Sequence, residues 1–200
     1  MKKRNPILGI AVLVIIGAVA GFMLRSGGAK AEITMNGTTY QMCTMTVRDF
    51  MEDGYVFATM STTDRSIYTY NFTNASLEAK SYYNSGVLLK VKDKYGAPIN
   101  IWVYNPTAEQ VEIREGKINS ISCDVQDLLA DGVAVSIAGL ELNDQTKDEI
   151  AAYMNDALKG YTYSENEDVN AISYTKGSVS YTFRFDEDDV LEAGIARNSV

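Results

Sequence analysis

The sequence predicts an α+β protein: one N-terminal transmembrane helix, then an extracytoplasmic part dominated by antiparallel sheet, with two short helices packed on the sheet. Three observations lead to this prediction. Residues 7–24 form an uninterrupted apolar run. Apolar and polar side chains alternate repeatedly in the rest of the chain, as half-buried strands require. Two segments, 47–53 and 147–159, have helical spacing and begin after capping residues.

The apolar run fixes the expected location of the protein. An apolar run of about 18 or more residues is long enough to cross a bilayer as a helix. Three cations precede the run at positions 2–4. The positive-inside bias therefore predicts a cytoplasmic tip at 1–6, a membrane anchor at 7–25 and a linker at 26–31, with the remaining chain outside the cell membrane.

A cleaved signal peptide is the alternative to an anchor. Ala29-Lys30-Ala31 matches the small-residue pattern at which signal peptides are cut, so secretion after cleavage following Ala31 stays open. The apolar run exceeds the roughly 7–15 residues of a signal core, which favours the uncleaved anchor. Gly17 and Gly21 form a small-xxx-small pair, which would allow contact between membrane helices and a homo-oligomer.

The part after the linker divides into two α+β halves, 32–130 and 131–200. The segments Thr46 to Tyr55 and Thr146 to Tyr161 share one order, namely a capped helix, a glycine, a tyrosine and then strands. This order suggests that the second half is a divergent repeat of the first.

The first half is expected to open with a hairpin, because Asn36-Gly37 is a strong signal for a tight turn. Thr46 and Asp49 resemble a capping box, which predicts the helix at 47–53, ending before Gly54. β-forming residues and turn signals predict the remaining strands. The expected strands are 32–35, 38–44, 55–59, 66–72, 86–92, 98–104, 110–114 and 117–124, the last two forming a hairpin across Glu115-Gly116.

The second half opens with a strand at 133–137. Thr146 and Glu149 form a full capping box, so a helix should begin at 147 and continue to about 159, where Gly160 ends it. Alternation of aromatic and polar residues predicts the strands that follow. These are 161–163, 171–175 and 179–185, and the segment 190–195 is either a last strand or a short helix.

The pattern of a capped helix, Gly-Tyr, and then Tyr-x-x-Gly-x-x-x-Tyr-x-Phe-x-Phe-Asp over residues 146–186 resembles a known unit. It is similar to the small α+β repeat of bacterial envelope proteins and of the beta-lactamase inhibitor protein. The resemblance implies a helical segment packed on one face of an antiparallel sheet, and a protein that binds or scaffolds other proteins. In overall style the chain also resembles uncharacterised membrane-anchored extracytoplasmic proteins of Gram-positive bacteria.

Composition excludes several classes of function. All 26 acidic residues lie after residue 31, against 13 of the 18 basic ones, so the exported part is strongly acidic and no nucleic-acid partner is expected. The chain has no histidine, which removes Ser-His and Cys-His catalysis and the commonest zinc ligand. The acidic run at 186–189 is typical of a solvated turn. We therefore predict no catalytic residue, no cofactor and no metal.

Two cysteines, Cys43 and Cys123, both lie in the exported part. Thiols outside the cell tend to pair, so a Cys43–Cys123 disulfide is expected. It would close a loop of about 80 residues and could stabilise the fold by roughly 4 kcal/mol in the chain-entropy model.

Trp102 and Tyr104 alternate with Ile101 and Val103 in one expected strand. If the aliphatic residues are buried, the aromatic pair lies on the other face and either is covered by a second sheet layer or forms a contact patch.

The combined prediction is a membrane-anchored, non-enzymatic binding or scaffolding protein of the bacterial cell envelope, with a protein or cell-wall partner. One alternative is a structural subunit of a larger membrane or surface assembly. A second is a carboxylate-dependent cell-wall hydrolase, since glycoside hydrolysis needs only a pair of carboxylates.

Overall fold

The computed structural model describes residues 29–60, 67–69, 75–91 and 94–200. Antiparallel sheet dominates and helices are few, so the expected sheet-rich α+β class is confirmed. Within the described ranges, no helix is both long enough and apolar enough to span a membrane. The predicted anchor at 7–25, with Gly17 and Gly21, lies outside the described residues.

The first half begins with a β-hairpin and a helix and continues with strands. Its elements are β1 (Glu32–Met35), β2 (Thr38–Gln41), α2 (Val47–Glu52), β3 (Tyr55–Met60), β4 (Ile67–Thr69), β5 (Ser76–Leu77), β6 (Tyr82–Val91), β7 (Lys94–Tyr104), β8 (Val111–Glu112), η1 (Ile113–Glu115) and β9 (Lys117–Asp124). Helix α3 (Val125–Ala130) connects this half to the next.

The second half repeats the order of hairpin, helix and strands. Its elements are β10 (Val135–Ile137), β11 (Leu140–Glu141), α4 (Lys147–Ala157), β12 (Thr162–Asn166), η2 (Glu167–Val169), β13 (Ala171–Lys176), β14 (Val179–Phe185) and β15 (Leu191–Asn198).

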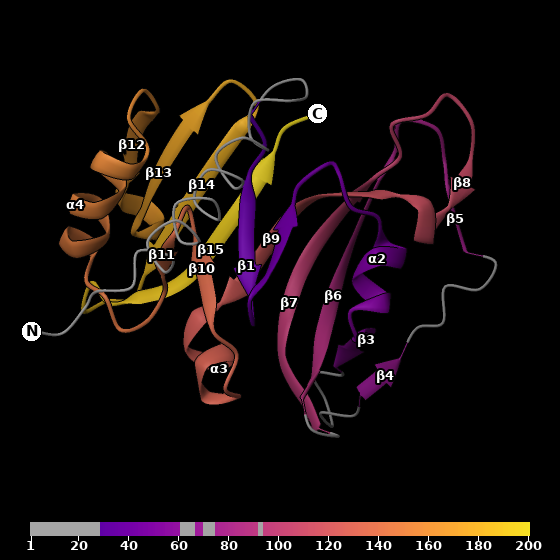
Figure 1. Cartoon of the computed structure of the whole chain (residues 1–200), viewed down its shortest axis with the longest axis horizontal. Helices are drawn as coiled ribbons and strands as arrows, with labels where there is room; N and C mark the ends of the chain where they lie inside the picture. The colour runs from indigo at the N-terminus through magenta and orange to yellow at the C-terminus, as the bar shows by residue number, and fades with distance from the viewer. Residues whose placement is uncertain (1–28, 61–66, 70–74, 92–93) are drawn as a thin grey trace, which may run out of the picture.

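The two halves meet twice, once in each main sheet. The large sheet has the order β12-β13-β14-β15-β9-β7-β6-β3-β4, so the last strand of each half, β15 and β9, pair antiparallel in the middle. The small sheet has the order β11-β10-β1-β2, in which β1 and β10, the first strands of the two halves, pair antiparallel. The halves therefore lie side by side and share one continuous sheet (Figure 1).

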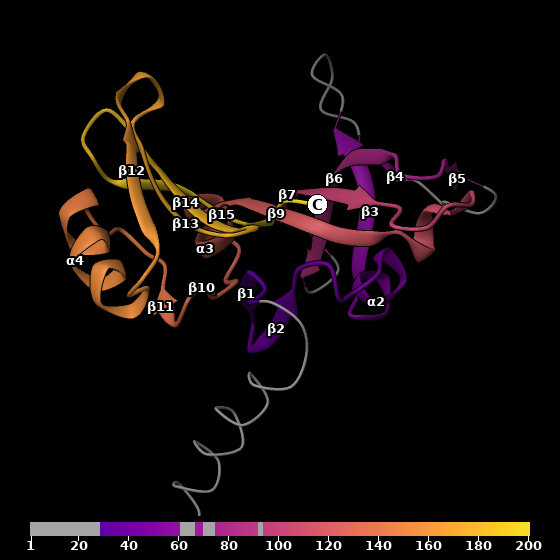
Figure 2. The same cartoon turned by 90° about the horizontal axis from the view of Figure 1, so that it is seen from above.

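The helices α2, α3 and α4 and the small sheet all lie on one side of the large sheet (Figure 2). The core fills the space between these layers, with Ile33 and Ile137 from the small sheet and Phe183 and Ile121 from the large sheet almost fully buried. At Gly194 in β15 the two layers are in close contact. A Cβ atom at Gly194 would lie 2.9 Å from the Cδ1 atoms of both Ile137 and Leu142.

Local sequence explains the shared beginning of each half. Both hairpin turns place two successive residues at positive φ, Asn36 (49°) and Gly37 (82°) in the first, Ala138 (51°) and Gly139 (85°) in the second. Such turns match the twist of the flanking strands. Both expected capping boxes are present: Thr46 with Asp49 at α2, and Thr146 with Glu149 at α4.

The structure differs from the expected elements in the middle of the chain. The predicted hairpin of 110–114 with 117–124 is wrong, because β8 pairs with β5 while β9 pairs with β7 and β15. Three α-helices occur among the described residues instead of the expected two, since Asp124 caps α3. Strand β6 also begins earlier than expected, at Tyr82, whose ring lies 4.8 Å from that of Tyr104 on the neighbouring strand. Of the strand expected at 66–72, the structure describes only Ile67–Thr69.

Candidate functional site

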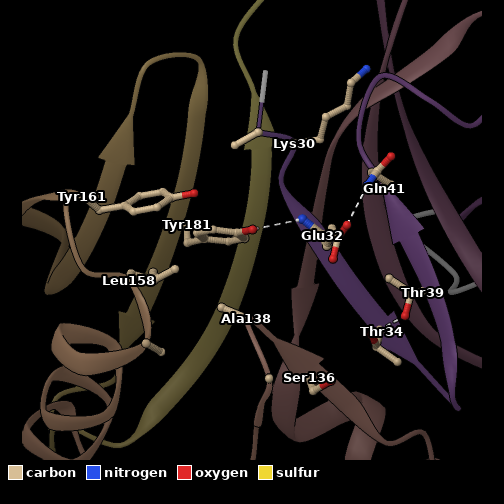
Figure 3. A pocket seen from close by; sticks show the side chains of 13 residues that line it. Lys30, Glu32, Thr34, Thr39, Gln41, Ser136, Ala138, Leu158, Tyr161 and Tyr181 are labelled. Carbon is tan, nitrogen blue, oxygen red and sulfur yellow. Dashed lines mark hydrogen bonds between the residues drawn. The ribbon is translucent and has the colours of Figure 1, made fainter. Parts of the chain in front are cut away.

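A groove of about 550 Å³ opens where the two halves meet, beside the small sheet. One wall comes from the first half, where Glu32 and Thr34 of β1 and Thr39 and Gln41 of β2 face it. The other wall comes from the second half, and consists of Ser136, the Ala138–Gly139 turn, the end of α4, Tyr161 and Tyr181. Figure 3 shows the two tyrosine rings opposite the polar side chains of the hairpin. Ala29 and Lys30, where the described chain begins, also line the groove.

Hydrogen bonds fix the polar wall of the groove. The Glu32 amide N–H donates to the Tyr181 hydroxyl at 3.2 Å, which ties the first strand of the domain to β14. The Gln41 amide Nε2 donates to the Glu32 carboxylate at 2.6 Å, and the Thr34 and Thr39 hydroxyls lie 2.9 Å apart (Figure 3). Side chains held by such bonds need less ordering when a ligand arrives.

The two tyrosines keep their protons near neutral pH. Burial raises the pKa of Tyr181 to about 12, although the hydrogen bond from the Glu32 amide works in the opposite direction. Burial, and then the Glu32 carboxylate, also raise the pKa of Tyr161. Their rings lie 6.1 Å apart, and the Lys176 ammonium lies 5.6 Å from the centre of the Tyr161 ring. Both hydroxyls can therefore act as hydrogen-bond donors.

The opposite face of the large sheet, which we call the outer face, carries two rows of mostly polar side chains that cross the strands. The register of the strand pairs places these side chains beside one another. The first row is Ser164, Ser173, Thr182, Ile195, Ser122 and Asn100. The second row is Thr162, Thr175, Ser180, Arg197, Ser120, Trp102 and Asn84. Neither row contains a carboxylate, although residues 32–200 contain all 26 acidic residues of the chain.

The aromatic end of the outer face is where the sequence placed a candidate contact patch. Ile101 and Val103 are fully buried, while Trp102 is 45% exposed and Tyr104 is half-buried. Tyr82, on the neighbouring strand, is 46% exposed and packs against Tyr104. The alternation was therefore read correctly, and Trp102 is open to solvent among the described residues rather than covered by a second layer.

The structure does not contain the expected disulfide, and both cysteines are free thiols. The Cys43 amide donates to the carbonyl of Ile118 at the start of β9, whereas Cys123 lies five residues further along that strand. Five strand residues span about 16 Å, and bridged cysteines need Cα atoms within ~7 Å. The two thiols are thus too far apart. Burial raises the pKa of the Cys123 thiol to about 12, so it stays protonated and unreactive.

Other sequence motifs contain residues that could carry chemistry, but the structure does not bring these residues together into a site. In the acidic run at 186–189, the Asp186 carboxylate accepts from the backbone N–H groups of Asp188 and Val190, so it closes a turn. No group of three or more potential metal ligands occurs among the described residues. Ser173 and Lys176 match an S-x-x-K motif, but residues three apart on β13 point to opposite faces of the sheet.

Sequence reasoning did not single out the groove. Tyr161 and Tyr181 fall in two predicted strands of the second half, and Glu32 falls in the predicted first hairpin. Nothing in the spacing of these three residues indicates that they converge, because β1 reaches β14 only through the packing of the small sheet on the large one.

Comparison with known proteins gives no relative from which a role could be carried over. The resemblance of residues 146–186 to the beta-lactamase inhibitor repeat stays a prediction. No family model matches the chain, and neither the curated proteins nor the solved structures that were compared show a significant similarity to it.

Proposed function

We propose that this protein is a membrane-anchored, extracytoplasmic binding or scaffolding protein of the bacterial cell envelope that acts by contact and not by catalysis. The observation that supports this function best is the outer face. It combines two rows of mostly uncharged polar side chains, with Arg197 as their one charged residue, and an exposed tryptophan; tryptophan and tyrosine are the residues that binding surfaces favour.

The partner that fits the outer face is an uncharged polymer of the cell wall. The two rows contain no carboxylate, and their hydroxyl and amide side chains can both donate to and accept from sugar hydroxyls. Neighbouring strands are about 4.8 Å apart, so each row repeats at a distance close to the length of one sugar residue in an extended chain. Trp102 offers a flat apolar surface near one end of the second row, beside Asn84.

The groove supports binding rather than hydrolysis. Glycoside hydrolases usually need two carboxylates that flank the scissile bond. Glu32 is the single carboxylate among the residues that line the groove, and its side chain already accepts a hydrogen bond from Gln41.

The start of the domain supports a retained anchor. Ala31 is fully buried, its N–H donates to the Asn198 side chain at 2.7 Å, and its carbonyl accepts from the Met42 N–H at 2.9 Å. Cleavage after Ala31 would leave the buried Asn198 oxygen and the Met42 N–H without these partners, which costs stability. Intact mass measurement of the protein isolated from membranes tests this point, and a mature chain that begins at Glu32 would contradict it.

A binding assay on the full-length protein tests the proposed function. The protein is reconstituted in phospholipid nanodiscs and incubated with purified, insoluble cell-wall glycan, and the bound fraction is measured after centrifugation. We expect retention of the native chain and a loss of affinity of about tenfold or more in Trp102→Ala, as for other aromatic contact residues.

The matched control is Tyr153→Ala, which removes a 40% exposed aromatic residue from α4, on the other side of the large sheet. Binding that the control reduces as strongly as Trp102→Ala, or no retention of the native chain at all, would contradict the assignment of the outer face.

A further inference from the structure

The groove between the halves is separate from the outer face and contains hydrogen-bonding groups that the fold itself does not use. The Tyr161 and Ser136 hydroxyls have no hydrogen-bond partner in the part of the chain that the structure describes. The Tyr181 hydroxyl accepts from the Glu32 amide, so its own proton is available to a ligand. On the opposite wall, one Glu32 oxygen accepts from Gln41, which leaves the second oxygen as an acceptor.

The groove is lined by one carboxylate and one ammonium group, so its charges favour ligands of neither sign. Glu32 would repel an anion. Lys30 lines the groove and would repel a cation, and the Lys176 ammonium already lies beside the ring of Tyr161. A neutral ligand avoids both costs, while the protonated tyrosines offer donors and Glu32 offers an acceptor.

The walls also offer apolar contacts at fixed positions. The Tyr161 and Tyr181 rings and the side chains of Leu158 and Ala138 form one side of the groove, opposite the polar hairpin (Figure 3). A volume of about 550 Å³ falls in the range of small-molecule sites. A ligand that suits this arrangement has an apolar face for the rings and hydroxyl groups at its edge.

The groove also lies close to the predicted membrane surface. Ala29 lines it, and the predicted anchor ends at residue 25. Four residues span at most about 14 Å of extended chain. In the anchored protein, the groove can therefore reach a ligand displayed just above the lipid head groups.

We propose that this groove is a binding site for a neutral saccharide unit of one to two sugars, held by Tyr161, Tyr181, Ser136 and Glu32. The saccharide can come from the head group of a glycolipid or from the end of a cell-wall glycan, because both present the same hydroxyl-bearing ring. This site rests on the proposed function only for its extracytoplasmic location.

Calorimetric titration of the full-length protein in uncharged phospholipid nanodiscs tests the proposal. Sugar-based detergents are left out because they would compete. The probes are a neutral N-acetylated disaccharide, its deacetylated cationic form and an acidic disaccharide of the same size. We expect the neutral probe to bind, and both charged probes to bind more weakly.

Two variants remove hydroxyls that the fold does not use, so folding should be unaffected. We expect Tyr161→Phe and Ser136→Ala each to weaken binding of the neutral probe by about three- to tenfold, the effect of one hydrogen bond. The control Tyr163→Phe removes a hydroxyl that donates to Glu165 outside the groove, and should leave the affinity unchanged.

A second comparison separates the two sources of the saccharide. The same disaccharide is attached to a lipid in the nanodisc and its affinity compared with that of the free sugar. Tighter binding of the lipid-linked form assigns the groove to a glycolipid head group, and equal binding assigns it to a glycan end.

Three outcomes would overturn the groove site: no binding of the neutral probe, equal binding of all three probes, or binding that Tyr161→Phe leaves unchanged. If Trp102→Ala abolishes disaccharide binding while Tyr161→Phe does not, the sugar binds to the outer face, so that the proposed function holds and the groove site fails.

Discussion

The two halves of the molecule follow the same order of elements, but the tyrosine that follows the helix is buried in one half and lines a groove in the other. In the first half, Tyr55 follows the glycine after α2, is 4% exposed and stacks on Phe50, whose ring centre lies 3.8 Å away. In the second half, Tyr161 follows the glycine after α4, is half-buried and lines the groove. The same local order therefore forms core in one half and an open site in the other.

The packing of aromatic rings also differs between the two halves. The first half places three rings together, since Tyr40 from β2 also packs edge-on against Phe50 and Tyr55. At the position of Phe50, counted from the capping threonine, the second half has Ile150. The helix there is also longer, 11 residues against 6, and its end reaches the groove at Leu158. The first half thus packs three rings together behind its helix, whereas in the second half Leu158 and Tyr161 line the groove.

Among the substitutions that this comparison suggests, Phe50→Ala should lower the free energy of unfolding most. Phe50→Ala removes a fully buried ring from the aromatic cluster and should lower the free energy of unfolding by about 3–5 kcal/mol. Tyr161→Ala, at the open site, should cost no more than about 1 kcal/mol, because its ring is only partly buried. Thermal unfolding of the full-length protein, followed by near-ultraviolet circular dichroism, measures both. Similar losses in the two variants would show that Tyr161 belongs to the core.

The close contact between the two sheets at Gly194 predicts an intermediate loss of stability for Gly194→Ala. Gly194→Ala forces a Cβ atom against Ile137 and Leu142, and overpacking of this kind costs about 1–3 kcal/mol. The same unfolding measurement applies. The double variant with Ile137→Val should recover part of the loss, because the two sites are in contact. If the stability losses of Gly194→Ala and Ile137→Val simply add in the double variant, the two layers do not contact each other at this point.

Removing the helix caps should cause the smallest loss of stability, and the loss should be equal in the two halves. Thr46→Ala and Thr146→Ala each remove the side chain that accepts the N–H of the third helical residue, at a cost of about 1 kcal/mol. A clear difference between the two variants would show that the longer α4 depends on its cap differently from α2.

The same caps should make stability dependent on pH. The Thr46 N–H lowers the pKa of Asp49, and the Thr146 N–H lowers the pKa of Glu149. A lowered pKa stabilises the fold above the ordinary pKa of the group, and this contribution is lost as pH falls through the lowered value. Stability should therefore decrease from about pH 4.5 downward, and Asp49→Asn with Glu149→Gln should flatten that decrease. If the double variant loses stability with falling pH as steeply as the native protein does, the two carboxylates do not cause this decrease.

The sequence by itself determined the sheet-rich class, the first hairpin turn, both capped helices and the alternation that puts Trp102 on the face opposite Ile101 and Val103. These features depend on residues within a few positions of one another, such as Asn36-Gly37 or the pair Thr146 and Glu149. Local backbone geometry and alternation are enough to specify them.

Only the tertiary structure decided the pairing of β9 with β15, the free state of Cys43 and Cys123, and the groove. Each of these depends on which distant strands lie side by side, and a register choice is settled by burial over the whole sheet. Glu32 and Tyr181 lie 149 residues apart and meet because the small sheet buries its inner face on the large one. Local spacing contains no information about that contact.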